Sequence, residues 1–225
     1  MPFWQEPLCL RSGEPIVLTV TPQFDKAYWE SHWQEAGHGA AREIVPNPHL
    51  GPETADLVPG TALDAGCGEG AEALFLADAG WRVTAVDMSA AVLARAAERA
   101  SSVGPSPQQV EWVEADLSTW QPGRRFDLVT THYAHPAMPQ LAFYERIADW
   151  VAPGGTLLIV GHRPSPDHTD HGHHPPEEAT ATVAGIRARL VPAHWEVVTA
   201  EERTRTVAGR DVPLFDVVVR ATRRP

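Results

Sequence analysis

The stretch ALDAGCGEGAEALFLA, residues 62–77, decides the fold of this chain, because an apolar run leads through three closely spaced glycines into a helical pattern. Residues 61–65 have the short apolar run of a buried strand, and residues 71–79 have the longer pattern of a helix. The glycines at 66, 68 and 70 permit a tight turn and let a ligand lie directly against the backbone. The stretch therefore predicts a strand, a ligand-binding turn and a helix within an α/β domain.

The same alternation of short apolar runs with longer helical patterns continues to the C-terminus. It predicts a doubly wound, mostly parallel seven-stranded sheet with helices on both faces. The two final runs are separated only by a polar stretch around Gly209, so we expect a hairpin that makes the last strand antiparallel to the others. Further strands are expected at 81–86, 110–114, 126–131, 155–161, 195–201 and 213–221, and further helices at 90–100, 141–151 and 177–190.

The first 60 residues have a weaker pattern. Residues 16–21 have the composition of a strand, residues 24–36 have the pattern of an amphipathic helix, and residues 45–60 are rich in proline and glycine. We therefore expect an N-terminal extension over residues 1–23, followed by a single domain over residues 24–225.

The composition limits the compartment and the partner. The chain has 29 acidic and 18 basic residues, which gives a net charge of −11, and this charge disfavours a nucleic-acid substrate. The chain has two cysteines, no basic start followed by a long apolar run, and no apolar stretch of the length that spans a bilayer. We expect a cytoplasmic protein that acts on a small molecule and involves neither membrane nor nucleic acid.

The glycine stretch favours S-adenosyl-L-methionine (SAM) over a nicotinamide dinucleotide. Its spacing is G-x-G-x-G rather than the G-x-G-x-x-G of dinucleotide-binding turns, and Glu69 places a carboxylate where a pyrophosphate would be repelled. An acidic turn that includes Asp64 is complementary to the sulfonium and ammonium groups of SAM. Asp87, at the end of the second strand, suits a carboxylate that accepts hydrogen bonds from both ribose hydroxyls, which either cofactor would supply.

Five segments in order extend this interpretation: DAGCGEG (64–70), VDMS (86–89), EADL (114–117), FDLVTTHY (126–133) and VAPGGTLLIV (151–160). Together they resemble the motifs of the class I, seven-stranded, Rossmann-like family of SAM-dependent methyltransferases. The resemblance covers residues 24–225. It implies an enzyme that transfers a methyl group from SAM to a small-molecule O, N or S acceptor.

The resemblance also implies a cofactor site, position by position. Gly66, Cys67 and Gly68 should pass along the methionine part of SAM, near Asp64. The ribose should lie at Asp87. The other implied positions are Met88 on the adenine, Asp116 with Leu117 at the adenine amino group, and Thr130 with Thr131 near the reacting methyl.

FDKAYWESHW, residues 24–33, resembles the N-terminal helix of small-molecule members of the thiopurine and tellurite-resistance type. In those enzymes aromatic residues of this helix cover the cofactor. Tyr28, Trp29 and Trp33 are therefore implied to form a lid, with residues 24–60 as a cofactor-covering helix and linker. An ordinary apolar stripe is the alternative for Trp29 and Trp33, which lie one helical turn apart.

Histidines supply the candidates for proton removal. His132 and His135 follow the fourth strand directly, at the carboxyl edge where open α/β sheets place their ligands, and imidazole titrates in a useful range. His132 is the first candidate for a general base. A second group of histidines lies in a loop at residues 162–176, whose spacing matches no regular zinc template, so we expect a substrate-covering loop without a specific metal site.

Two other classes of function remain open at this point. One is a SAM- or metal-binding regulatory protein without catalysis. The other is a nucleotide-dependent oxidoreductase, which the spacing of the glycines and Glu69 disfavour.

Overall fold

The structure, a computed structural model, describes residues 24–36, 45–103, 109–163, 179–205 and 214–225. Their strands form one seven-stranded sheet in the order β3-β2-β1-β4-β5-β7-β6. Every neighbouring pair from β3 to β5 is parallel, and β7 is antiparallel to both β5 and β6. The predicted fold is thus confirmed. The strands are β1 (Thr61–Ala65), β2 (Arg82–Asp87), β3 (Val110–Glu114), β4 (Phe126–His132), β5 (Val151–His162), β6 (Trp195–Arg205) and β7 (Leu214–Arg223).

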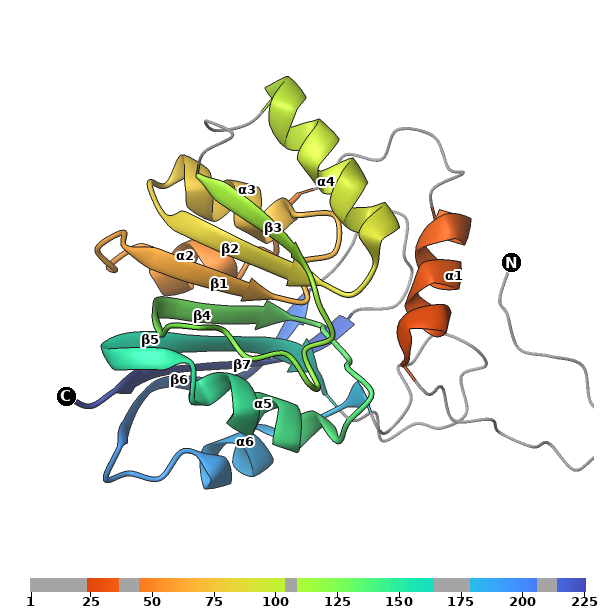
Figure 1. Cartoon of the computed structure of the whole chain (residues 1–225). Coiled ribbons are helices and arrows are strands. Elements are labelled where there is room, and N and C mark those ends of the chain that lie inside the picture. The colour runs from red at the N-terminus through yellow and green to blue at the C-terminus, as the bar shows by residue number, and fades with distance from the viewer. Residues whose placement is uncertain (1–23, 37–44, 104–108, 164–178, 206–213) are drawn as a thin grey trace, which may run out of the picture.

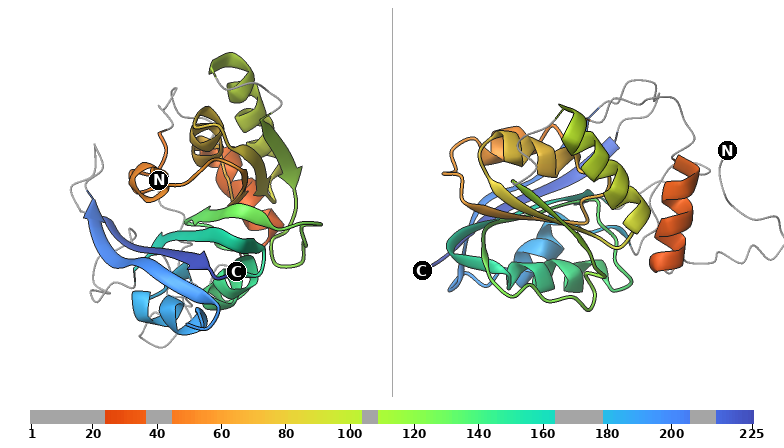
Figure 2. Two further views of the ribbon diagram at one scale, coloured as in Figure 1. Left: turned by 90° about the vertical axis from the view of Figure 1, so that its left-hand side faces the viewer. Right: turned by 45° about the horizontal axis from the view of Figure 1, so that its top comes forward.

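Helices cover both faces of this sheet (Figures 1 and 2). One apolar cluster joins the sheet to α2 and α3 through Leu50, Ala73 and Leu76, and the other joins it to α5 and α6 through Phe143 and Ile186. The central strands are buried from both sides, which explains their nearly continuous apolar runs. The helices are α1 (Lys26–Ala36), α2 (Leu50–Thr54), α3 (Ala71–Asp78), α4 (Ala90–Val103), α5 (Gln140–Ala148) and α6 (Val183–Arg189).

The position of α1 matters most for function. It stands beyond the carboxyl ends of the parallel strands rather than on a face of the sheet (Figures 1 and 2). In an open α/β sheet these strand ends are where ligands bind. In the described parts of the chain, none of the helices combines the length and apolar character needed to cross a bilayer.

Three local predictions were wrong. The helix predicted to run to residue 151 ends at Ala148, and Val151 instead begins β5, where it is fully buried and pairs with Phe126. The helix expected from residue 177 begins at Val183, because the Thr182 side chain accepts a hydrogen bond from the backbone N–H of Gly185 and so caps it there. The short helix α2 was not predicted, since the proline and glycine content of its segment indicated a linker.

Some predictions fall outside the described residues. They are the N-terminal extension at 1–23 with its strand at 16–21, the turn around Gly209, and most of the histidine-rich loop at 162–176.

Candidate functional site

The turn between β1 and α3 is held against the end of β2. The backbone N–H groups of Gly66 and Cys67 both donate to the carbonyl oxygen of Val86, at 2.9 and 3.0 Å. Gly66 has a φ of 81°, and a Cβ there would collide with the side chain of Ala134. Gly68 has a φ of 48°, and a Cβ there would lie 3.2 Å from Cζ2 of Trp33. The turn therefore requires glycine for its conformation and for the close approach of other segments.

Asp87 ties this turn to the second strand. Its Oδ2 accepts a hydrogen bond from the backbone N–H of Gly68, and its Oδ1 accepts one from the backbone N–H of Ser89, both at 3.0 Å. Burial raises the pKa of the Asp87 carboxyl, and the hydrogen bonds from Ser89 and Gly68 act in the opposite direction. Asp87 thus orients the turn and also lines the cavity beside it.

Asp64 lies behind the turn as a buried acid. Its side chain is 1% exposed, and Oδ2 has no hydrogen-bond partner among the described residues. Burial, followed by the nearby carboxylates Glu72 and Asp87, raises its pKa well above the usual value. Asp64, a predicted site residue, is not among the residues that line the cavity, whereas Glu69, Glu72 and Asp87 are. This acidic lining fits the sulfonium and ammonium groups of SAM.

A cavity of about 500 Å³ opens at these strand ends. Its size lies within the range of roughly 300–1,000 Å³ for small-molecule sites. No lysine or arginine is among the described residues that line it. The predicted site residues that line it are Tyr28, Trp29, Trp33, Gly66, Cys67, Gly68, Asp87, Met88, Leu117, His132 and His135.

Thr130 and Thr131 do not line this cavity, contrary to the expectation that both lie near the reacting methyl. Both are fully buried, and the hydroxyl of Thr131 donates to the carbonyl oxygen of Ala65 at 2.8 Å. The physical reason is that β4 extends to His132, one residue further than predicted. The threonines thus stay within the sheet, and the residues that follow them reach the cavity.

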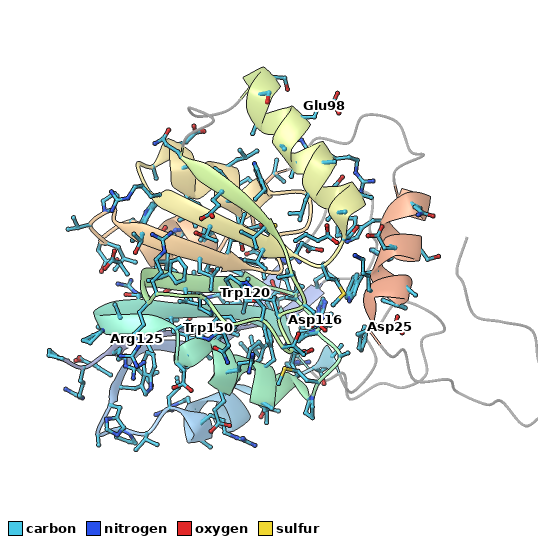
Figure 3. The ribbon with its side chains drawn as sticks, viewed as in Figure 1. Asp25, Glu98, Asp116, Trp120, Arg125 and Trp150 are labelled. Carbon is cyan, nitrogen blue, oxygen red and sulfur yellow. The ribbon has the colours of Figure 1, made fainter. Side chains whose placement is uncertain are left out.

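Asp116 is also absent from the cavity wall, although its neighbours Ala115 and Leu117 belong to it. It follows β3 at the edge of the sheet that faces α1 (Figure 3). Its Oδ1 accepts a hydrogen bond from the backbone N–H of Ser118 at 2.8 Å, so the side chain caps the turn there. The expected contact of Asp116 with an adenine amino group is therefore not built into the described cavity.

The helix α1 covers the cavity through aromatic side chains. Trp29 Nε1 donates to the carbonyl oxygen of His135 at 3.1 Å, and the Trp29 ring stacks on that of His135 with their centroids 6.4 Å apart. Arg95 of α4 donates to the carbonyl oxygen of Trp33 at 3.2 Å, and its guanidinium lies over the Trp33 ring. These contacts favour the lid over the alternative of an ordinary apolar stripe.

The histidines at the end of β4 have different surroundings. His132 Nε2 is shielded from solvent and has no hydrogen-bond partner among the described residues, and Nδ1 lies 3.5 Å from Oγ1 of Thr130. Nδ1 of His135 lies 3.2 Å from Oε1 of Gln140. Burial lowers the pKa of both imidazoles, so both are neutral near pH 7, and His132 has the free nitrogen.

Sequence reasoning missed several residues of the cavity wall, chiefly Glu72 and Tyr133. Phe24 and His162 also line it, and they lie in the segments predicted to cover the cofactor and the substrate. Tyr133 belongs to a recognised motif, but only its contacts with distant segments give it a role. Glu72 lies in the first turn of α3, and no sequence pattern marks it as a residue of the cavity. Within the described ranges no three histidine, cysteine or acidic side chains are grouped to hold a metal ion, and His168, His171, His173 and His174 lie outside those ranges.

Comparisons with known proteins agree with this geometry. A family model described as a methyltransferase domain matches residues 62–155. Thiocyanate methyltransferase 1 of Brassica oleracea is 29% identical over 88% of this chain and 86% of its own length. Probable thiol methyltransferase 2 of Arabidopsis thaliana is 27% identical over 89% of this chain and 88% of its own.

Among solved structures, the magnesium protoporphyrin IX methyltransferase of Synechocystis PCC 6803 with bound SAM superposes with a TM-score of 0.63. It has 20% sequence identity and covers 89% of this chain and 95% of that one, so the likeness concerns the fold. These proteins are all methyltransferases, which supports the enzyme over the oxidoreductase and the non-catalytic regulator. With the sheet order and the acidic glycine turn, these similarities support a class I SAM-dependent methyltransferase of the small-molecule type.

Proposed function

We propose that the enzyme methylates the sulfur atom of a small, uncharged thiol, with His132 removing the proton of the acceptor. The observation that carries this proposal is that His132 lines the cavity while its Nε2 is buried and has no hydrogen-bond partner among the described residues. Two relatives that match most of this chain are named as methyltransferases of thiocyanate and of thiols, which supports a sulfur acceptor.

The charge around the cavity favours a neutral acceptor over an anion such as thiocyanate. Glu69, Glu72 and Asp87 line the described cavity, whereas no lysine or arginine does. Arg95 and Arg99 of α4 pair with Glu69, so Glu72 and Asp87 carry most of the negative charge of the lining. A free anion would be repelled by these carboxylates before the positive charge of the cofactor is counted. A thiol enters without charge, and it then needs a group that accepts its proton.

The residues of this chain would hold the cofactor as follows. The glycine turn would pass along the methionine part, Asp87 would accept hydrogen bonds from the ribose hydroxyls, and Met88 with Leu117 would pack on the adenine. Asp64 and Glu72 would supply negative charge next to the cationic part. When bound, SAM supplies an electrophilic methyl group on a sulfonium, and its transfer leaves S-adenosylhomocysteine.

Residues of the protein would also remove the proton of the acceptor and exclude water from the cavity. His132 takes the proton from the acceptor sulfur on Nε2 as the sulfur forms its bond to the methyl carbon, and it later releases that proton to water. Trp29, Trp33 and Phe24 cover the cavity and exclude water, which keeps the nucleophile desolvated. We place this activity in the cytoplasm and on a free small molecule, which the net charge of −11 supports against nucleic acid.

The test is a methyl-transfer assay with an aryl thiol and the phenol and aniline of the same size, and with thiocyanate as the small anion. The products are identified by mass spectrometry. We expect the thiol to react fastest. Methylation of thiocyanate but of no thiol contradicts the neutral acceptor, and a faster reaction with the phenol or the aniline contradicts the assignment of sulfur. His132→Ala serves as the control that links the reaction to this cavity.

A further inference from the structure

Tyr133, the residue after His132, has an unusual backbone conformation. Its φ is 55°, in the left-handed region that a bulky side chain seldom adopts. Such a conformation persists where the surrounding structure holds it, and it is commonest at functional sites. Tyr133 also lines the cavity, where its ring stacks on that of His162 with the centroids 4.5 Å apart.

A buried polar network holds the Tyr133 hydroxyl. The hydroxyl oxygen accepts hydrogen bonds from Nη2 of Arg205 at 2.9 Å and from Nδ2 of Asn47 at 3.1 Å. Nε of Arg205 donates to Oδ2 of Asp216 at 2.7 Å, and Nε2 of His49 lies 3.1 Å from the same oxygen. Asp216 is fully buried, so the hairpin of β6 and β7 and the segment before α2 converge on one phenol.

The segment that follows Tyr133 is held from other sides. Ala134 packs against Gly66 of the glycine turn, and its carbonyl oxygen accepts a hydrogen bond from Nε2 of Gln140 at 2.9 Å. The carbonyl oxygen of His135 accepts one from Trp29. Among the described residues, the His132 ring has only the long contact with Thr130 as a hydrogen bond, so its direction depends on the backbone that these neighbours hold.

We propose that Tyr133, together with Arg205 and Asp216, is a positioning unit that fixes the orientation of the His132 ring in the cavity wall, where its Nε2 would take the proton of the acceptor. The proposal rests on the proposed function, because it assigns His132 as the proton acceptor. Tyr133 itself acts through His132 and is a positioning residue.

The chemistry of the network suits this role. Burial strongly raises the pKa of the Tyr133 hydroxyl, so the phenol stays protonated and anchors the loop without titrating near neutral pH. The titratable groups that face His132 are Glu72, His49 and Asp216, and two of them belong to or touch the network. A change in the network therefore alters both the direction of the imidazole and its electrostatic surroundings.

The test uses Tyr133→Phe, which keeps the ring and removes the hydroxyl, and Arg205→Gln, which breaks the ion pair. Arg203→Gln is the matched control, because Arg203 lies two residues earlier on β6 and pairs with Glu53 and Glu201 instead. We expect Tyr133→Phe and Arg205→Gln to lower the rate of thiol methylation roughly 10- to 100-fold, the usual consequence of a misplaced catalytic group, without changing the affinity for SAM. Arg203→Gln should leave the rate unchanged.

Two further readouts separate positioning from a structural role. In a His132→Ala background, Tyr133→Phe should cause no further loss of rate, because the group that it positions is already gone. In wild type and in both variants, ¹⁵N-histidine NMR should show that the His132 tautomer and pKa change when the network is broken, with the pKa rising toward its ordinary value as water enters.

The outcomes show whether the positioning unit fails or whether the proposed role of His132 in methyl transfer fails. Additive losses in the double variant, or a His132 signal that is unchanged in Tyr133→Phe and Arg205→Gln, overturn the positioning unit. A changed His132 signal with an unchanged rate of methylation instead removes His132 as the proton acceptor and overturns the proposed function. If no acceptor of the panel is methylated, the NMR signals alone decide whether the network positions the ring.

Discussion

The carboxylate of Asp87 accepts a hydrogen bond from the backbone N–H of Gly68 at 3.0 Å, and this bond joins the end of β2 to the glycine turn after β1. The two residues are 19 positions apart in the sequence. Asp87 therefore has two tasks in our interpretation, since it holds the turn in shape and presents the same carboxylate to the ribose.

Replacing Asp87 should weaken cofactor binding more than a single lost contact would. Asp87→Ala removes the bonds to the ribose, each worth about 1.5–3 kcal/mol for a charged acceptor, and it also releases Gly68. Asp87→Asn keeps the size and one acceptor oxygen, so its loss of affinity should be smaller. Calorimetry with SAM measures both variants, and an unchanged affinity in a folded Asp87→Ala protein removes Asp87 from the ribose site.

A side chain at Gly68 should be tolerated poorly. Its φ of 48° is unfavourable for other residues, and a Cβ would press on Trp33 of the lid. Gly68→Ala should weaken SAM binding, and Gly68→Val should abolish it. Gly154 is the matched control, because it also has a positive φ but a Cβ added there would meet no atom within 4 Å, so Gly154→Ala should leave SAM affinity unaltered. Normal binding by Gly68→Val would contradict the placement of the turn beside the cofactor.

Loss of His132 should affect the transfer step and spare cofactor binding. His132→Ala should lower the rate roughly 100- to 10,000-fold, the usual contribution of general base catalysis. Burial lowers the pKa of His132, so wild-type activity should be lost only as the pH falls below the ordinary histidine range. The gap between wild type and variant should narrow at a pH where the thiol ionises by itself, and a constant gap across the pH profile would argue against a proton-accepting role.

Asp64 should lower the stability of the ligand-free protein while it favours binding of the cofactor. Because burial raises its pKa in the folded protein above the ordinary value of 3.8, its stabilising contribution is present below that value and is lost as the pH rises through the folded pKa. Asp64→Asn should therefore raise the unfolding temperature of the ligand-free protein at neutral pH, and it should weaken binding of the cationic cofactor. Thermal unfolding at several pH values, with and without SAM, measures both effects.

Asp127 provides a control, because its pKa is lowered in the folded protein whereas that of Asp64 is raised. A hydrogen bond from the backbone N–H of Thr61 lowers the pKa of its carboxyl, so its contribution is present at neutral pH and is lost as the pH falls. Asp127→Asn should lower the unfolding temperature slightly and leave SAM affinity unchanged. If Asp64→Asn behaves in the same way, the buried acid is a structural group and not a partner of the cofactor.

The sequence by itself determined the sheet and the edge of it at which the cavity opens. The glycines of residues 66–70 and the apolar runs that alternate with helical patterns are local signals, and each strand was placed within a few residues of its observed position. The antiparallel last strand followed from the short polar connection before it. These features depend on neighbours in the chain, and residue patterns record them directly.

Only the tertiary structure decided which side chains reach the cavity. The end of β4 lies one residue later than the pattern indicated, so Thr130 and Thr131 are buried and the segment from His132 onward forms the wall. Tyr133 depends on Asn47 and Arg205, which are 86 and 72 residues away in the sequence. The direction of a side chain at a strand end is set by register and by such distant partners, and no periodicity in a single sequence encodes them.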